Sequence, residues 1–286
     1  MDFRLAKTAV TIFAGVAALG LGSAPAALAA PAGGGTEFVP CNGYALQGAF
    51  DSASYGTTLI LAPGCTYYLH QGLHTMTRVT IIGHSTTITQ ARDAGGFTLL
   101  TVGNCESANV TVINVNFTGG GGDTEDGGAI YNLNRLTVEG GTFSDNISDD
   151  DGGAIENDGQ MRVTGATFTH NLAPNGGAIL NDGPAIIEGS SFTWNHAPGE
   201  NAYGGAIYND DDLFLGHDGF LGNSSDNNAG AIYNEDNMAA SHITVTANAA
   251  GDDGGGIYND DNAAVNDSMV FGNQPDNCYN VPGCLG

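Results

Sequence analysis

Acidic side chains recur at a regular interval in the second half of the sequence. One follows each of a series of asparagines that are 24 to 28 residues apart, and the series reads Asp158, Asp182, Asp210, Glu235 and Asp260. Carboxylate oxygens are the ligands that Ca²⁺ prefers in proteins. If the repeats stack as neighbouring strands, these like charges lie about 4.8 Å apart and repel unless they are solvated, protonated or bridged by a cation. The stripe is thus either a solvated edge or a Ca²⁺ site, and the residues indicate no other cofactor.

Aromatic residues occupy a second periodic position, two residues before an acidic one. Tyr208, Tyr233 and Tyr258 hold it in three successive repeats, and Trp194 is the single tryptophan of the chain. Aromatic rings beside carboxylates can dock sugar rings, because a ring offers an apolar body next to polar groups. Outward-facing tyrosines are also common on strands for packing reasons alone. These four residues are our candidates for ligand binding.

The residues give less support to catalysis. Asp145, His170 and Trp194 share one position in successive repeats, and an Asp–His pair can act as acid and base. Arg135 and Arg162 lie in adjacent repeats and are the cationic pair that a polysaccharide lyase would need. No pair of carboxylates stands out for glycoside hydrolysis. The catalytic residues are therefore unknown, with Asp145, His170, Arg135 and Arg162 as candidates.

Two paired motifs must position all of these residues. The first is Gly-Gly-Ala-Ile-x-Asn or a close variant, and it covers residues 127–132, 152–157, 176–181, 204–209, 229–234 and 254–259. The second is Phe-x-x-Asn, and it begins at Phe143, Phe168, Phe192 and Phe220, with Val245 and Val270 in the same place later. A fixed period of this length is the signature of a solenoid.

Each repeat has room for three short alternating strands and for no helix. Gly, Asn and Asp separate the strands, as turns require. Stacking would align the isoleucines in one buried column and the phenylalanines in another, with asparagines bonded to each other at the corners. The sequence therefore predicts an all-β, single-stranded parallel β-helix over 57–273, with regular repeats from about residue 117.

Both ends of such a stack need covers. Residues 31–56 form a linker and an N-terminal cap, with an amphipathic helix over 44–54 that is apolar at Leu46, Ala49 and Phe50. Residues 274–286 form a C-terminal cap loop. The spacing of the cysteines favours Cys41–Cys65 and Cys278–Cys284 as disulfides, which leaves Cys105 as a buried free thiol.

The paired GGAI and FxxN motifs resemble the polymorphic outer membrane protein repeat of chlamydial surface proteins. The opening around Cys41 and Cys65 and the ending around Cys278 and Cys284 look like those of secreted right-handed β-helix proteins of actinobacteria. The resemblance implies a right-handed coil of the pectin-lyase-like superfamily. The chlamydial proteins are adhesins, whereas the superfamily also contains polysaccharide lyases and glycosidases, so the fold alone selects neither function.

The N-terminus and the net charge indicate where the protein acts and which partners it can bind. Residues 1–30 read as a signal peptide, with Arg4 and Lys7 before an apolar stretch and Ala27-Leu28-Ala29 as the cleavage signal. We therefore expect a secreted, extracellular protein without a transmembrane segment. The formal net charge of −25, from 31 acidic and six basic residues, argues against nucleic-acid binding, which needs Lys and Arg to neutralise phosphates.

Two functions remain open. The first is a non-catalytic, adhesin-like or cell-envelope module that binds or displays, with Ca²⁺ as a candidate stabilising ion. Its partner would be a cell-surface or extracellular glycan or protein, and it would act as a monomer. The alternative is a carbohydrate-active enzyme, a lyase or a glycoside hydrolase. The scarcity of Lys and Arg and the regular repeats favour the first.

Overall fold

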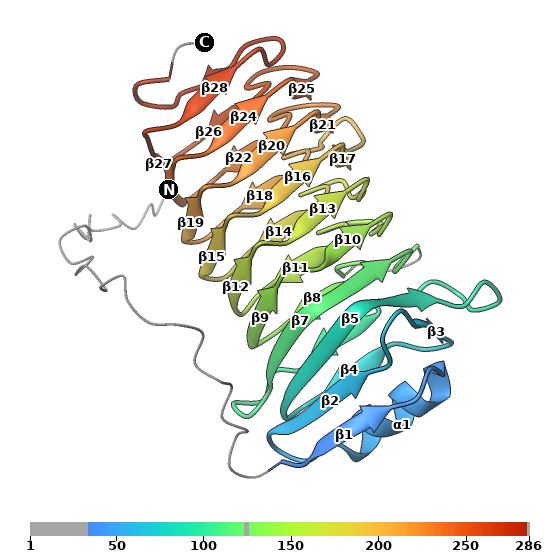
Figure 1. Ribbon diagram of the computed structural model, residues 1–286. Coiled ribbons are helices and arrows are strands. Elements are labelled where there is room, and N and C mark those ends of the chain that lie inside the picture. Colours follow the sequence, from blue (N-terminus) through green and yellow to red (C-terminus); the bar gives the residue numbers. More distant parts are fainter. Residues whose placement is uncertain (1–33, 123–125, 285–286) are drawn as a thin grey trace, which may run out of the picture. The chain divides into compact units, whose positions relative to one another are not determined.

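The computed structural model describes residues 34–122 and 126–284, and these form a parallel β-solenoid of about ten turns (Figure 1). Every pairing between named strands is parallel, as expected when each turn of the coil repeats the path of the one before. The predicted β-helix is therefore confirmed. The predicted signal peptide, residues 1–30, lies outside the described residues.

One sheet of nine strands carries the Gly-Gly-Ala-Ile-x-Asn motifs, and we call it the GGAI sheet. Its strands are β4 (Leu73–Thr75), β6 (Leu100–Val102), β8 (Ile130–Asn132), β11 (Ile155–Asn157), β14 (Ile179–Asn181), β18 (Ile207–Asn209), β22 (Ile232–Asn234), β26 (Ile257–Asn259) and β29 (Cys278–Tyr279). A three-stranded sheet contains β17 (His196–Ala197), β21 (Ser224–Ser225) and β25 (Ala249–Ala250).

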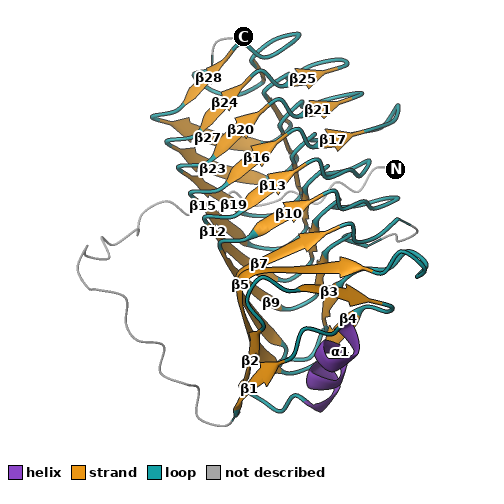
Figure 2. Ribbon diagram, turned by 45° about the vertical axis from the view of Figure 1, so that its right-hand side comes forward, coloured by secondary structure: helices purple, strands orange, loops and turns teal. Residues whose placement is uncertain are grey.

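The largest sheet has 17 strands, which form two rows in the regular part of the solenoid (Figure 2). The first row contains β9 (Arg135–Glu139), β12 (Gln160–Thr164), β15 (Ala185–Glu188), β19 (Leu213–Gly216), β23 (Asn237–Ser241) and β27 (Asn262–Asn266). The second row contains β10 (Thr142–Ser144), β13 (Thr167–Thr169), β16 (Ser191–Thr193), β20 (Gly219–Leu221), β24 (Thr244–Thr246) and β28 (Met269–Phe271).

Near the N-terminus the two rows merge into longer strands. The early strands are β1 (Thr36–Val39), β2 (Thr57–Leu61), β3 (Thr66–Leu69), β5 (Arg78–Gln90) and β7 (Asn109–Thr118). β5 is one continuous strand, and it shifts its register against β7 between Ile82 and Thr86. A bend without a break lets one strand pair with both β2 and β3.

The core consists of columns that run along the solenoid. The motif isoleucines from Ile130 to Ile257 pair in register and are fully buried. The phenylalanine rings from Phe117 to Phe220 stack with centroids 4.8–5.3 Å apart. Because each residue packs mainly on its counterparts in the turns above and below, the stability of the fold is a sum over neighbouring turns.

Two ladders of buried asparagines line the corners. In the first, each side-chain Nδ2 from Asn132 to Asn234 donates to the Oδ1 of the next turn at 2.6–2.8 Å. In the second, from Asn146 to Asn248, the same bond measures 2.9 Å. The predicted asparagine corners are confirmed. In the second ladder the residue before each asparagine has a left-handed backbone, as at His170 with φ 55°.

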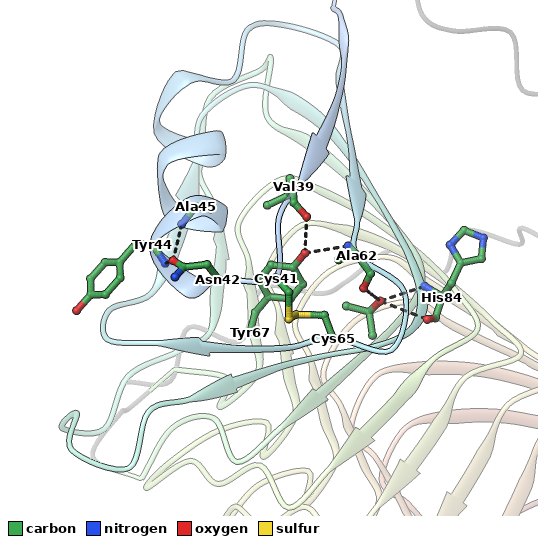
Figure 3. The surroundings of a disulfide bond; sticks show 10 residues. Val39, Cys41, Asn42, Tyr44, Ala45, Ala62, Cys65, Tyr67 and His84 are labelled. Atoms are coloured by element: carbon green, nitrogen blue, oxygen red, sulfur yellow. Dashed lines mark hydrogen bonds between the residues drawn. A yellow bond between two sulfur atoms is a disulfide. The ribbon is translucent and has the colours of Figure 1, made fainter.

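A helix covers the N-terminal end (Figure 2), and a disulfide lies next to it. Helix α1 (Gly43–Ser52) begins at Asn42, whose Oδ1 accepts bonds from the backbone N–H groups of Tyr44 and Ala45. Its buried face is Leu46, Ala49 and Phe50, as predicted. Figure 3 shows the disulfide Cys41–Cys65 beside the phenol of Tyr67, which donates to the Val39 carbonyl at 2.7 Å.

The tail supplies a last strand and a second disulfide. β29 pairs with β26, so Cys278 and Tyr279 continue the GGAI sheet by one turn. The Cys278–Cys284 disulfide closes the loop that follows, as predicted. Cys105 is a free thiol that is half-buried rather than buried, with its Sγ 3.6 Å from the Sδ of Met76.

Candidate functional site

The outward face of the GGAI sheet carries a column of tyrosines, which we call the tyrosine ladder. Tyr208, Tyr233 and Tyr258 occupy equivalent positions of β18, β22 and β26, as the sequence predicted. Their rings stack with centroids 5.2 and 5.0 Å apart. Since neighbouring rings cover each other's faces, the stack leaves little ring surface open to solvent. Tyr233, in the middle, is only 7 % exposed.

The ladder and the acidic stripe form one hydrogen-bonded unit. Tyr208 and Tyr233 each donate the hydroxyl to the carboxylate that follows the motif in the next turn. Tyr233 reaches Asp260 at 2.7 Å, and Tyr208 bonds Glu235 in the same way. Burial, and then the bond to the neighbouring carboxylate, raises the pKa of both phenols above its ordinary range. The phenols therefore stay protonated and hold the carboxylates in fixed orientations.

An earlier turn repeats this pairing and then breaks it. Tyr131 donates to Asp158 at 3.0 Å, but the next residue of the column is Glu156, a carboxyl group rather than a phenol. Glu156 is 9 % exposed, and burial raises the pKa of its side chain to about 8, with Asp158, Asp126 and Asp151 adding repulsion. Near neutral pH this carboxyl group therefore keeps its proton.

The predicted metal ligands lie along the same face. Asp158, Glu235 and Asp260 accept tyrosine hydroxyl groups, whereas Asp182 follows the turn that holds Glu156. Desolvation, followed by repulsion from Asp210 and Asp158, raises the pKa of Asp182 to about 6. Residues 34–122 and 126–284 contain no cluster of three or more His, Cys, Asp or Glu side chains that could hold a metal ion. Ca²⁺ binding stays a prediction from sequence.

The candidate acid–base pair lies at an exposed corner beyond the second row. Asp145 and His170 occupy consecutive turns, each in a left-handed conformation. The ring of His170 bonds the hydroxyl of its neighbour Thr169 at 2.9 Å. The ion pairs found within the described residues are His70–Asp93, Arg162–Glu188 and His196–Asp226, and Asp145 with His170 is not among them. Asp145 and His170 therefore hold equivalent positions in adjacent turns but do not form an ion pair.

The two candidate arginines are each engaged by a different neighbour. Arg162 forms an exposed ion pair with Glu188 in the next turn. Arg135 donates to the side-chain oxygen of Gln160 at 2.8 Å. Their strands β9 and β12 pair so that Gln160, rather than Arg162, lies beside Arg135. The two guanidinium groups therefore share a face but do not meet at a common partner.

Two further tyrosines pack against the ladder, and the sequence did not predict them there. Tyr279 stacks on Tyr258 with a centroid distance of 4.6 Å. Tyr203 comes from the longest repeat and tilts against Tyr233 at 4.8 Å. Tyr279 left a readable signal, because Cys278-Tyr279-Asn280 replaces the usual Ile-Tyr-Asn. Tyr203 left none, since its counterparts in the adjacent turns are Asn175 and Asn228, so no tyrosine repeats at this position.

These features define a β-solenoid that repeats a Phe-strand, an asparagine corner and a GGAI strand. Residues 140–158 match the family described as the Chlamydia polymorphic membrane protein repeat. The matched segment runs from the strand of Phe143 through its corner to Asn157, and so contains both motifs. Among curated proteins, none matches the chain significantly. Within the described residues, no helix combines the length and apolarity that crossing a membrane requires.

Proposed function

We propose that the protein is a non-catalytic, adhesin-like binding module that is exported and acts outside the cell. Three observations support this: the match to a repeat named for polymorphic membrane proteins, the solenoid scaffold, and the signal-peptide pattern of residues 1–30. The actinobacterial resemblance and the pectin-lyase-like superfamily fit the same proposal. Stacked turns provide an extended, rigid surface, which is what solenoids use for binding.

The tyrosine ladder carries the proposal for the binding face. Glu235 and Asp260 are exposed carboxylates that adjacent phenols already hold in place, at a spacing set by the solenoid. Groups that are fixed before binding lose little conformational entropy when a ligand arrives. A carboxylate accepts hydrogen bonds from vicinal hydroxyl groups, so we propose an extracellular glycan as the partner of this face.

The test removes a phenol hydroxyl and keeps the ring stack. Tyr208→Phe frees Glu235 to rotate, and we expect at least tenfold weaker binding to the glycan that the wild-type protein selects on a glycan array. Tyr68→Phe is the matched control, because Tyr68 is exposed on β3, far along the sequence from the ladder. Equal affinity of Tyr208→Phe and wild type for that glycan would refute this assignment of the face.

The enzymatic alternative rests on the alignment of Asp145 and His170. It predicts product release from uronate polymers or neutral glycans, with or without Ca²⁺, and loss of that product in His170→Ala. We propose instead that no product forms. Turnover that depends on His170 would replace the binding function with a catalytic one.

Ca²⁺ is the remaining part of the proposal. If cations bridge the stripe from Asp158 to Asp260, EDTA lowers the melting temperature and added Ca²⁺ restores it. An unchanged melting temperature in EDTA would show that Ca²⁺ does not stabilise the protein. The tyrosine hydroxyl groups would then be the partners of the acidic residues.

A further inference from the structure

From β10 to β24 the second row of strands presents hydroxyl groups to solvent, except at β20, whereas the last strand, β28, presents Met269 and Phe271. From β10 to β24 the outward residues are Thr142 and Ser144, Thr167 and Thr169, Ser191 and Thr193, and Thr244 and Thr246. In β20 these positions hold Gly219 and Leu221. Both substitutions fall in one strand that pairs in register with β16 and β24. Within the strands from β10 to β24, one turn therefore lacks the hydroxyl groups that its neighbours on both sides present.

This exception creates a hollow. Where Gly219 lacks a side chain, a depression of about 290 Å³ opens, bounded by Ser191, Thr193, Leu221, Thr244 and Thr246. The surface inside it is apolar, because carbon atoms of these side chains face inward. None of the bounding residues is ionisable, although the chain carries a net charge of −25. The hollow thus suits an uncharged group with an apolar face.

An exposed indole follows one of the residues that bound the hollow. Trp194 follows Thr193 and is 58 % exposed. Its six-membered ring fills the space over Gly222, where an added Cβ would meet ring atoms at 2.8–3.0 Å. Gly222 in turn follows Leu221 of β20. The glycines of this turn therefore do two things, since Gly219 opens the hollow and Gly222 gives the indole a place to lie.

We infer that this hollow binds a neutral sugar residue of an extracellular glycan. The apolar interior and the indole can contact the C–H face of a pyranose ring. The surrounding Ser and Thr hydroxyl groups both donate and accept hydrogen bonds. Uronates are disfavoured, since an acidic protein offers them no cation here.

The inference rests on the proposed glycan-binding function but concerns a separate site. The hollow lies on the second row, whereas the tyrosine ladder lies on the GGAI sheet. Because Trp194 is the single tryptophan of the chain, its fluorescence reports on the hollow without interference. The experiment titrates the full chain with neutral oligosaccharides of β-1,4-glucan, β-1,4-xylan and mannan, and with oligogalacturonate as the anionic comparison.

Gly219→Thr restores the hydroxyl row and fills the hollow. No heavy atom lies within 4 Å of a Cβ at Gly219, and its backbone is not left-handed, so the variant should fold with an unchanged melting temperature. Gly95→Thr makes the same change at another open position and is the matched control. We expect a neutral oligosaccharide to shift the fluorescence of wild type and Gly95→Thr, with at least tenfold weaker binding by Gly219→Thr.

A second variant tests the indole itself. Trp194→Ala should fold, because Ala247 holds the same corner position with φ 56°, close to the 58° of Trp194. Calorimetry should show at least tenfold weaker binding of the same oligosaccharide.

Three results would overturn the inference: no fluorescence change with any neutral oligosaccharide, binding by Gly219→Thr equal to wild type, or a response to oligogalacturonate alone. Tyr208→Phe separates the two sites. If it loses glycan-array binding while its tryptophan response persists, both proposals stand. If the array shows no binding but the tryptophan responds, only the ladder proposal fails.

Discussion

The column that contains the tyrosine ladder shows how one residue changes the electrostatics of its surroundings. Where the column holds tyrosine, as at Tyr131, the next carboxylate receives a hydrogen bond. Where it holds Glu156, two acidic groups lie in adjacent turns without that donor, and the buried group keeps its proton instead. Asp218 is a second buried carboxyl group. It accepts bonds from the backbone N–H groups of Ser190 and Gly216, yet burial still raises its pKa to about 7.

These raised pKa values predict that mild acid stabilises the protein. The folded pKa of Glu156 and of Asp218 lies well above the ordinary values of 4.5 and 3.8, so the folded state holds protons that the unfolded chain has released. Their stabilising contribution is present below the ordinary pKa and is lost as pH rises through about 7 to 8. Thermal unfolding should therefore show a higher melting temperature at pH 5 than at pH 8.5.

Single variants separate this effect from general charge repulsion. Glu156→Gln and Asp218→Asn should each flatten the dependence of melting temperature on pH. Glu139→Gln, at an exposed position of β9, removes a charge without removing a buried group and should leave the slope unchanged. A melting temperature that rises with pH in the wild type would contradict the linkage.

At the scale of the element, each short strand depends on its counterparts in the adjacent turns. A strand such as β13 has three residues, and only the central one, Phe168, points into the core. Its ring stacks on Phe143 and Phe192 at 4.8 Å on either side. An isolated strand of this length is not stable by itself. The stack of phenylalanine rings therefore provides the stability of each strand.

Phe168→Ala tests this dependence. Removing the ring leaves a cavity between two stacked neighbours, and we expect a loss of about 3–5 kcal/mol in the free energy of unfolding. Thr169→Ala, on the outward face of the same strand, should change it by about 0.5 kcal/mol or less. Denaturant unfolding followed by circular dichroism measures both, and similar losses in the two variants would contradict the column as the source of stability.

The sequence predicted the parts of the fold that repeat in register. The isoleucines, the phenylalanines and the corner asparagines recur at one interval, and stacking turns a common interval into a column. The continuous strand β5 was not predicted, because the sequence at its bend over Gly83 and His84 does not differ from that of a turn between two strands. β1 was missed because its four residues carry no repeat and gain their place only by pairing with β2.

The candidate site was predictable as positions but not as interactions. Spacing placed Tyr208 and Glu235 in adjacent turns, whereas the bond between them depends on side-chain directions that spacing does not contain. Spacing likewise does not reveal the raised pKa of Glu156, because burial in the folded protein causes it. The hollow at Gly219 was missed because a glycine in a strand signals a bulge or a close approach more often than a binding site.

At the scale of the whole molecule, the two disulfides secure the two ends of the solenoid. Cys41–Cys65 ties the N-terminal helix segment to the first turns, and Cys278–Cys284 closes the loop after the last strand. A solenoid is weakest at its ends, since an end turn has one neighbour instead of two. The covers therefore limit fraying of a stack whose interior turns support one another.

Cys278→Ser with Cys284→Ser should loosen one end and spare the other. The short loop it releases contributes about 2 kcal/mol by the chain-entropy estimate. Hydrogen exchange should accelerate first in β29 and β26 and then in β22, while β2 and β5 keep their protection. Uniform acceleration along the chain would show that the solenoid opens as one unit instead of from its end.

The asparagine ladders give the solenoid a direction. In both ladders every bond from one side-chain amide to the next runs toward the C-terminal end. The last donors then need acceptors, and the tail provides them: Asn259 donates to the Asn280 carbonyl, and Asn273 to the Asn277 side chain. A rod with one donor end and one acceptor end could polymerise head to tail. By giving these donors acceptors within the same chain, the tail opposes head-to-tail addition of a second copy at this end.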